Sequence, residues 1–311
     1  SYQFNLIFFM IFFSRIGYFF FKCFIISSFL FSKTSFPGFD IFSSSLSLGM
    51  GGGGYLITPS PSYTNINPSM YRGKIFSYSI IRYPASVTNH NLGMVLPIYD
   101  GFGNFSINHL SYGIIEGYDE DLKSTGTFNA SDTKLTTGYS VESNKYPLSF
   151  GVSSNFFISN YSTHKLFIST LNMGLNLSLE KYKTFIGVSI HDFGKGFGNL
   201  KIDFDPKFVF SSSKQLTHLP LVLYADWITK KNSISTILIG GEFQVSNKFQ
   251  LRFGTSTNKF DQNMQNKIIN TVLGSTGFGA SFKTQNIYFH YGIFLYGTGA
   301  LINGLEIEIV L

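Results

Sequence analysis

Hydrophobic residues alternate with polar residues or glycine along much of this chain, and this spacing limits its possible folds more than any other feature. In residues 171–180 every odd position is apolar, and every even position is polar or glycine. The same alternation is clear in 249–254 and 305–309, and weaker in 148–155, 184–191, 271–282 and 286–294. Because side chains of a β-strand point alternately to its two faces, each segment predicts a strand with one apolar face.

The rest of the chain after residue 36 predicts turns and loops, and no amphipathic helix, because Gly, Ser, Thr and Asn interrupt every helical pattern. Short turn segments lie between the strand candidates, at 99–101, 143–145, 181–183, 246–248 and 283–285. Longer polar segments lie at 117–132, 192–217 and 257–270. We count about fourteen strand candidates, and short turns alternating with long loops are typical of a membrane barrel with two different rims.

The composition fits a protein with one surface in lipid and one in water. Aromatic residues make up 18% of the 311 residues, charged residues only 13%, and the mean hydropathy is +0.14. A soluble domain has about 25% charged residues. The net charge is +6, but three of the 23 basic residues lie in residues 1–35, which contain no acid, so the remainder carries +3. No strong basic field remains, and nucleic acid is not an expected partner.

The alternation is compatible with two folds, a soluble β-sandwich with its apolar faces inside or a membrane barrel with its apolar face outside. The apolar N-terminus, the low charge, the Phe and Tyr content and the absence of cysteine after Cys23 favour the barrel. Strands in hydrocarbon must close into a ring, because an open edge would leave backbone N–H and C=O groups unpaired. We therefore predict an all-β fold, a transmembrane antiparallel β-barrel of about 14 strands in a bacterial outer membrane, in contact with its lipid.

The N-terminal residues are almost wholly apolar from 5 to 31, which allows either a transmembrane helix or a signal peptide. Basic Lys22, the short apolar run 23–31 and the small residues after it favour the signal. The predicted organisation is a signal peptide at 1–35, a plug inside the barrel at 36–72 and the barrel itself at 73–311.

A glycine-rich stretch and an Asn-Pro turn define the predicted plug. Its residues are Gly49, Met50, Gly51, Gly52, Gly53, Gly54, Asn67 and Pro68. Glycine permits close backbone approach, so such a chain can pass tightly through a barrel, although a flexible linker has the same composition. Glycines 49, 51 and 54 also match a dinucleotide-binding spacing, but the following residues, with prolines at 59 and 61, cannot open the helix that this site needs.

Three groups of segments resemble the FadL-like barrels, and in particular their PorV/PorQ branch. The first group is the opening at 47–55 and 64–68. The second contains Gly126, Phe128, Ala130 and Asp132. The third contains Leu251, Arg252 and Gly254, preceded by the segments 219–221, 226–227 and 240–243. Together the segments cover most of residues 46–311.

This resemblance implies a fourteen-stranded barrel with its N-terminal segment tucked into the lumen. It also implies a non-enzymatic role in type IX secretion, with other secretion-system proteins and secreted cargo as partners. The alternative is a FadL-like transporter of hydrophobic small molecules, which predicts an apolar lumen pocket near the plug and an opening in a strand wall. A lumen lined only by polar side chains would rule that alternative out.

The sequence predicts no catalytic residues, no metal site and no cofactor. The six histidines lie singly, without metal-ligand spacing. A second alternative, a lipid-modifying enzyme, would need a Ser–His pair facing lipid, and the same-face pairs are His109 with Ser111 and His164 with Ser162. The acidic residues at 116–121, and Asp203 with Asp205, are read as solvated loops.

Overall fold

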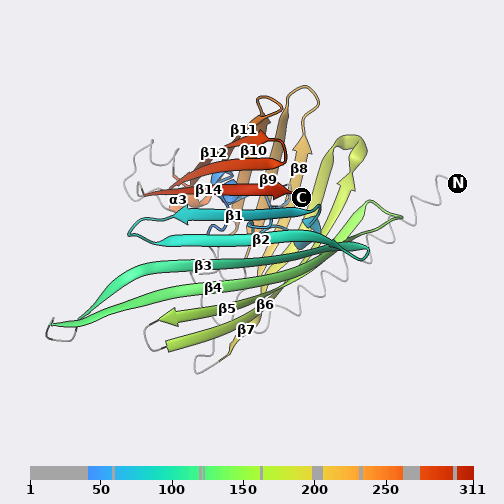
Figure 1. The fold of residues 1–311 in the computed structure, drawn as a ribbon. Helices are drawn as coiled ribbons and strands as arrows, with labels where there is room; N and C mark the ends of the chain where they lie inside the picture. The colour runs from blue at the N-terminus through green and yellow to red at the C-terminus, as the bar shows by residue number, and fades with distance from the viewer. Residues whose placement is uncertain are drawn as a thin grey trace.

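The chain forms one closed antiparallel β-barrel of fourteen strands (Figure 1). The structure is a computed structural model, and it describes residues 41–57, 60–118, 121, 123–161, 164–197, 206–230, 234–261, 274–296 and 300–311. Each strand pairs with its neighbours in the sequence, and the ring closes where β1 pairs with β14. The predicted fold class and the count of about fourteen strands are confirmed.

The first half of the barrel contains most of the long strands. These strands are β1 Ile75–Arg82, β2 Thr88–Ile98, β3 Gly101–Tyr118, β4 Ser124–Glu142, β5 Leu148–Tyr161, β6 His164–Leu179 and β7 Thr184–Phe197. The second half contains shorter ones, namely β8 Lys207–Gln215, β9 Leu221–Thr229, β10 Thr236–Gln244, β11 Phe249–Ser256, β12 Thr276–Thr284, β13 Ile287–Leu295 and β14 Leu301–Val310.

The barrel has apolar side chains on its outside and polar side chains inside, the reverse of the arrangement in a soluble protein. On β6, Leu171, Met173 and Leu175 are exposed on the outer surface, whereas Asn172 and Asn176 are buried inside. On β14, Leu305 and Ile307 are likewise exposed, and the side chain of Glu306 is only 1% exposed. A sandwich would bury the apolar set, so these exposures exclude it. The outward apolar face suits hydrocarbon, as a transmembrane barrel requires.

The two ends of the barrel differ, as the sequence predicted. All five short turn segments lie at the end where β1 begins and β14 finishes, which we call the short-turn end. The opposite end, the loop end, contains the connections after β1, β3, β5, β7, β9, β11 and β13. The loop prediction was partly wrong. Residues 124–132 belong to β4 and 207–215 form β8, where the side chains of Asp132, Lys207, Ser211 and Ser213 are buried on the lumenal side instead of lying in a solvated loop.

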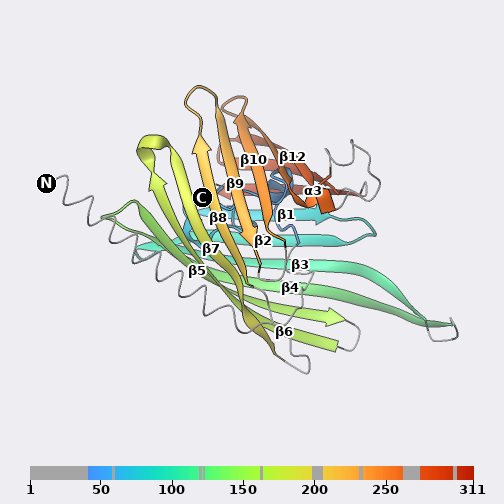
Figure 2. The same cartoon turned by 180° about the vertical axis from the view of Figure 1, so that it is seen from behind.

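Strands β3 to β7 extend further toward the loop end than the others, and the β3–β4 hairpin projects furthest (Figures 1 and 2). The pairing of β2 with β3 stops at Thr88 and Ser111, while β3 continues beside β4 to Tyr118. On the other side, β7 pairs with β8 only as far as His191 but with β6 as far as Phe197. The barrel wall therefore continues at the loop end as a five-stranded extension.

Helical structure is short in the described residues. It comprises α2 Ser45–Gly49, η2 Pro68–Met70, η3 Glu180–Tyr182 and α3 Asn258–Asp261. Among the described ranges no helix is long and apolar enough to span a bilayer. The predicted signal peptide at 1–35, residues 36–40 of the predicted plug, and Asp119, Glu120, Ser162, Asp203 and Asp205 lie outside the described residues.

A charge placed on the outer face tests the reversed polarity. Leu175 is 39% exposed in the middle of β6, so Leu175→Arg would put a guanidinium against hydrocarbon. We expect the free energy of unfolding from lipid vesicles to fall by about 2–4 kcal/mol. The control is Tyr99→Arg at a short turn, where the side chain is 98% exposed and the cost should stay below about 1 kcal/mol. Equal losses in urea titrations would contradict an outer face in lipid.

Candidate functional site

Residues 41–57 and 60–71, which we call the lumenal segment, lie inside the barrel and precede β1. Helix α2 lies against β11 to β14, and η2 lies against β4 to β6. Nearly all described side chains of the segment are buried. The predicted plug residues from Gly49 to Gly54, with Asn67 and Pro68, all lie in this segment, whereas the predicted boundaries of 36 and 72 stay predictions.

The local sequence explains the path of the segment. The side chain of Ser44 accepts a hydrogen bond from the backbone N–H of Leu46 and so caps the start of α2. The helix ends at Gly49, and the chain turns at Gly51, whose φ is +65°. A Cβ at Gly51 would also lie 2.7 Å from the backbone of Gly254 on β11. Both the positive φ and this close contact therefore require glycine. No helix begins in the described residues 55–57 and 60–67, so the structure shows no helix N-terminus after Gly54 in those ranges.

Glycines in the wall accept the lumenal segment at close range. A Cβ built on each of these wall positions would lie within 3.1 Å of an atom of the segment. We call them the lumenal glycines, and they are Gly93, Gly138, Gly151, Gly174, Gly187, Gly240, Gly254, Gly277, Gly279, Gly292 and Gly304. Several are paired with one another on adjacent strands, so that parts of the inner wall carry no side chains.

Two of these glycines show how tight the contact is. A Cβ at Gly277 would lie 1.8 Å from the carbonyl oxygen of Leu48, and one at Gly174 would lie 1.8 Å from Oδ1 of Asn67. No side chain can occupy such positions without moving its neighbour. A glycine inside a strand often marks close approach of another backbone, and here that backbone is the lumenal segment.

A single buried carboxylate holds two parts of the segment. Glu306 on β14 accepts hydrogen bonds at Oε2 from Ser44 Oγ (2.5 Å), Ser45 N (2.9 Å) and Ser45 Oγ (3.2 Å). Its Oε1 accepts a fourth from Ser60 Oγ at 2.5 Å. Hydrogen bonds to a charged group contribute about 1.5–3 kcal/mol each to stability, so this cluster is a principal attachment of the segment.

Other wall groups attach the segment around the barrel. Asp226 on β9 accepts from the backbone N–H of Gly54 at 2.7 Å. Asn67 donates from Nδ2 to the backbone carbonyls of Leu175 and Val188, both at 3.3 Å. Further donors from the wall are Asn89 to the carbonyl of Phe42, Asn91 to that of Ser62, Lys134 to the hydroxyl of Thr64 and Ser140 to the carbonyl of Tyr71. The attachment is therefore polar and distributed over many strands.

The centre of the segment is apolar. Its buried cluster comprises Leu46, Met50, Leu56, Ile57, Tyr63, Ile66, Met70 and Tyr71, together with Val95 and Tyr224 from the wall. Burial raises the pKa of Tyr63 well above its usual value of 10, so its hydroxyl stays protonated and donates to the carbonyl of Gly53 at 3.0 Å. This part of the lumen is consequently filled by hydrophobic side chains.

The inner wall is not uniformly polar. Toward the loop end, the inward positions of β3 to β6 carry the buried side chains Leu110, Ala130, Phe157, Leu166 and Ile168. Nearer the short turns the same face carries Asn, Ser and Thr. The lumen is therefore not lined by polar side chains alone, and we call this region the apolar inner face.

The residues of the second resembling group lie on β4. Gly126 is exposed near the tip of the β3–β4 hairpin, with φ +102°, and Phe128 packs edge-on against Tyr161 with ring centres 5.5 Å apart. Ala130 belongs to the apolar inner face, and Asp132 accepts a hydrogen bond from Tyr112 at 2.6 Å. Strands β4 and β11 are seven steps apart around the ring, so these residues lie opposite the third group and form no common site with it.

The third group forms a joined unit on β10 and β11. Glu242 pairs directly with Arg252, and Gly240 with Gly254. Arg252 Nε donates to Glu242 Oε2 at 2.7 Å on the lumenal side, while Leu251 is exposed to the outside. Gly254 contacts the backbone of Met50 in the lumenal segment.

Sequence reasoning missed the wall residues that hold the segment. Glu306 stands in the alternating run 305–309, and its charge in a strand so close to the C-terminus was the available signal. The glycine in nearly every strand was a second signal. Neither signal indicated which residues of the segment the wall would contact, because those residues lie far away in the sequence.

Histidine contacts of the described residues do not match the predicted enzyme pairs. His109 bonds to Thr133 at 2.9 Å rather than to Ser111. Two other Ser–His pairs occur, Ser189 with His191 at 2.8 Å and Ser281 with His290 at 2.5 Å, and both are buried on the lumenal side. A lipid-modifying site would need such a pair on the outer face.

Comparison with known proteins finds the fold among transport proteins. No family profile and no curated protein sequence matches the chain. The crystal structure of the Pseudomonas putida toluene transporter TodX superposes with a TM-score of 0.54 at 12% identity, over 86% of this chain and 97% of TodX. A Pseudomonas aeruginosa FadL homologue superposes with a TM-score of 0.56 at 11% identity, over 87% and 98%.

These likenesses establish a shared barrel fold. TodX is a toluene transporter, and at 11–12% identity the FadL-like resemblance is matched in fold alone. The PorV/PorQ branch and its secretion partners have no such support and stay a prediction.

The close contact at Gly277 gives a direct test of how the segment is held. Gly277→Ala would press a methyl group against the backbone of Leu48 and Gly51. We expect the free energy of unfolding to fall by about 1–3 kcal/mol, as in other overpacked sites, with faster hydrogen exchange in residues 45–54. The control is Gly103→Ala, where the nearest atoms belong to the flexible side chain of Ile98. If both variants match the wild type in exchange, the segment does not lie against this wall.

Proposed function

We propose that the protein is a transporter of small hydrophobic molecules in a bacterial outer membrane, with the lumenal segment as its plug. The observation that carries this proposal is that the barrel has both the apolar inner face and, elsewhere in the lumen, the apolar cluster of the segment. A pore for ions or sugars needs a continuous polar path, whereas a hydrophobic solute needs apolar surface along its route. The fold shared with TodX, a toluene transporter, supports the same function.

The two ends of the barrel suggest a direction. Outer-membrane barrels have short turns on the periplasmic side and longer loops outside. The apolar inner face then lies on the external side, where a hydrophobic solute would first enter. Several polar attachments of the segment, such as those from Asn91 and Lys134, lie nearer the short turns than Leu110, and they hold the barrier that the solute must pass.

The bulge in β3 supports an opening in the side of the barrel wall, which an unbroken wall would not. The register of β3 against β4 shifts between Ser111 and Ile114, and Gly113 has φ +78°. This shift lies where β2 has ended, so β3 has a backbone edge without a strand partner there. The bulge is next to Tyr112, beside the apolar inner face. A second register shift lies between β6 and β7, at Leu171 and Met173.

An uptake assay tests the function. A host with a lipopolysaccharide outer membrane that lacks its own hydrocarbon channel should take up radiolabelled toluene several-fold faster when it expresses this chain. Phe157→Asn, which places an amide on the apolar inner face, should slow uptake by about tenfold, because an unpaired amide disfavours contact with an apolar solute. Phe157→Leu is the control and should keep most of the rate. Uptake equal to that of an empty vector at equal surface expression would refute the proposal.

A disulfide lock tests whether the lumenal segment must move. The hydroxyl oxygens of Ser62 in the segment and Ser77 on β1 are 2.6 Å apart, close to the disulfide length of about 2.05 Å. In a Cys23→Ser background, oxidised Ser62→Cys/Ser77→Cys should reduce toluene uptake to the empty-vector level, and reduction should restore it. Ser62→Cys alone should stay insensitive to oxidation. Full uptake by the locked protein would show that this part of the segment stays in place during transport.

A further inference from the structure

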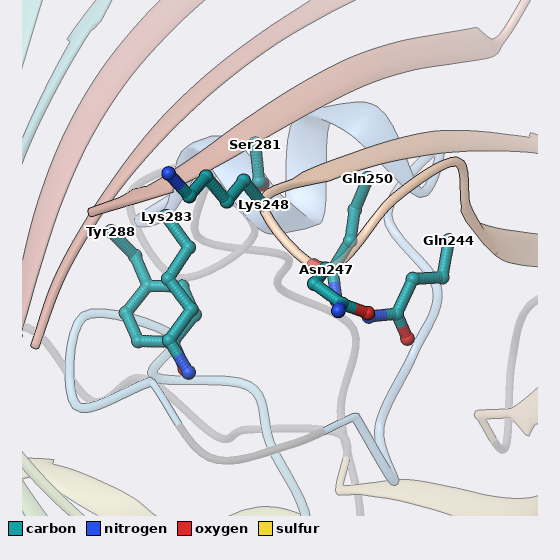
Figure 3. A pocket seen from close by; sticks show the side chains of 7 residues that line it. All are labelled: Gln244, Asn247, Lys248, Gln250, Ser281, Lys283 and Tyr288. Carbon is teal, nitrogen blue, oxygen red and sulfur yellow. The ribbon is translucent and has the colours of Figure 1, made fainter. Parts of the chain in front are cut away.

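A polar pocket of about 120 Å³ lies at the short-turn end, on the inner side of β10 to β13 (Figure 3). It is distant from the apolar inner face, which lies toward the loop end of β3 to β6. The side chains that line it are Gln244, Asn247, Lys248, Gln250, Ser281, Lys283 and Tyr288. All seven can form hydrogen bonds, and none of them is an acid.

The pocket is rich in hydrogen-bond donors. Gln250 accepts at Oε1 from Arg252 at 3.1 Å, so its amide nitrogen is left to donate toward the pocket. Lys248 and Lys283 bring two ammonium groups. Within the described part of the chain neither lysine has an acidic partner at ion-pair distance, and Lys283 Nζ lies 4.9 Å from the ring centre of Tyr288 instead.

The acids beneath the pocket do not line it. Glu242 is paired with Arg252, which also donates to Ser281. Ser281 bonds to His290, whose second ring nitrogen lies 3.9 Å from Glu308. Among the residues that line the pocket, Lys248 and Lys283 are the charged ones, so the lining is positive.

We infer that this pocket binds a small oxyanion, with a phosphate group as the chemistry that fits best. Ammonium groups bind phosphate oxygens as point charges, and the amides, the serine hydroxyl and the phenol supply further donors for the remaining oxygens. The phosphate can belong to a free anion in the periplasm or to the headgroup of a phospholipid at the inner rim. This inference does not depend on toluene transport, because the pocket and the apolar inner face share no residue.

Phosphate binding is measurable on the purified full chain in zwitterionic detergent. Titration with inorganic phosphate, followed by calorimetry or by ³¹P line broadening, should saturate for the wild type. The double variant Lys248→Gln/Lys283→Gln removes both ammonium groups and should weaken binding by about tenfold or more. Thermal unfolding of the variant should stay close to that of the wild type.

The chain offers a matched control, Lys145→Gln/Lys181→Gln. These lysines also lie in short turns and over tyrosine rings, at 5.4 and 5.8 Å from the ring centres, and the charge change is identical. The control should bind phosphate within about twofold of the wild type, because both lysines lie outside the pocket. Equal weakening in both double variants, or no saturable binding by the wild type, would overturn the inference.

Lipid nanodiscs separate the two sources of the phosphate. If the pocket takes lipid headgroups, nanodiscs of phosphatidylglycerol should compete with free phosphate in the wild type but not in Lys248→Gln/Lys283→Gln. If it takes the free anion, phosphate should bind equally in nanodiscs of phosphatidylglycerol and phosphatidylcholine. Either result supports the oxyanion site and identifies its source. Toluene uptake by the same variants should be unchanged, so a failure here is distinguishable from a failure of the proposed transport.

Discussion

Backbone pairing between β1 and β14 is the interaction on which the rest of the structure depends. It leaves no strand edge along the paired wall, so the apolar side chains can face hydrocarbon without exposing unpaired N–H and C=O groups. The same closure separates an interior from the lipid. Only within that interior can charged groups such as Glu306 and Arg252 lie on strands whose outer neighbours are exposed leucines.

Attachment through polar groups gives the lumenal segment a particular kind of stability. Separating two apolar surfaces in water loses the whole hydrophobic contribution, whereas a hydrogen bond to Glu306 or Asp226 can be exchanged for one to water at a net cost of about 1.5–3 kcal/mol. The lumenal glycines add close contact without interlocking side chains. The segment also packs hydrophobic side chains against Val95 and Tyr224 of the wall, so leaving the wall means separating these contacts as well as the polar ones.

The strands were predictable because the lipid imposes one simple requirement on every second residue. The count, the short turns and the outward direction of Leu175 and Leu305 followed from that rule. The strand segments at 124–132 and 207–215 did not, because they contain polar side chains, such as Asp132, Ser211 and Ser213, that face the lumen and so resemble loop residues. The role of Glu306 was equally hidden, since its partners Ser44 and Ser45 are 262 and 261 residues away and only the closed ring brings them together.

That separation also bears on the order of assembly. The lumenal segment precedes every strand, yet the carboxylate that receives four of its hydrogen bonds lies on the strand that completes the ring. A barrel that has acquired only its first thirteen strands lacks this acceptor and cannot retain Ser44 and Ser45 there. The segment is thus retained there only after the last strand has joined the barrel. An incompletely assembled molecule is distinguishable by a free N-terminal region that periplasmic proteases can cleave.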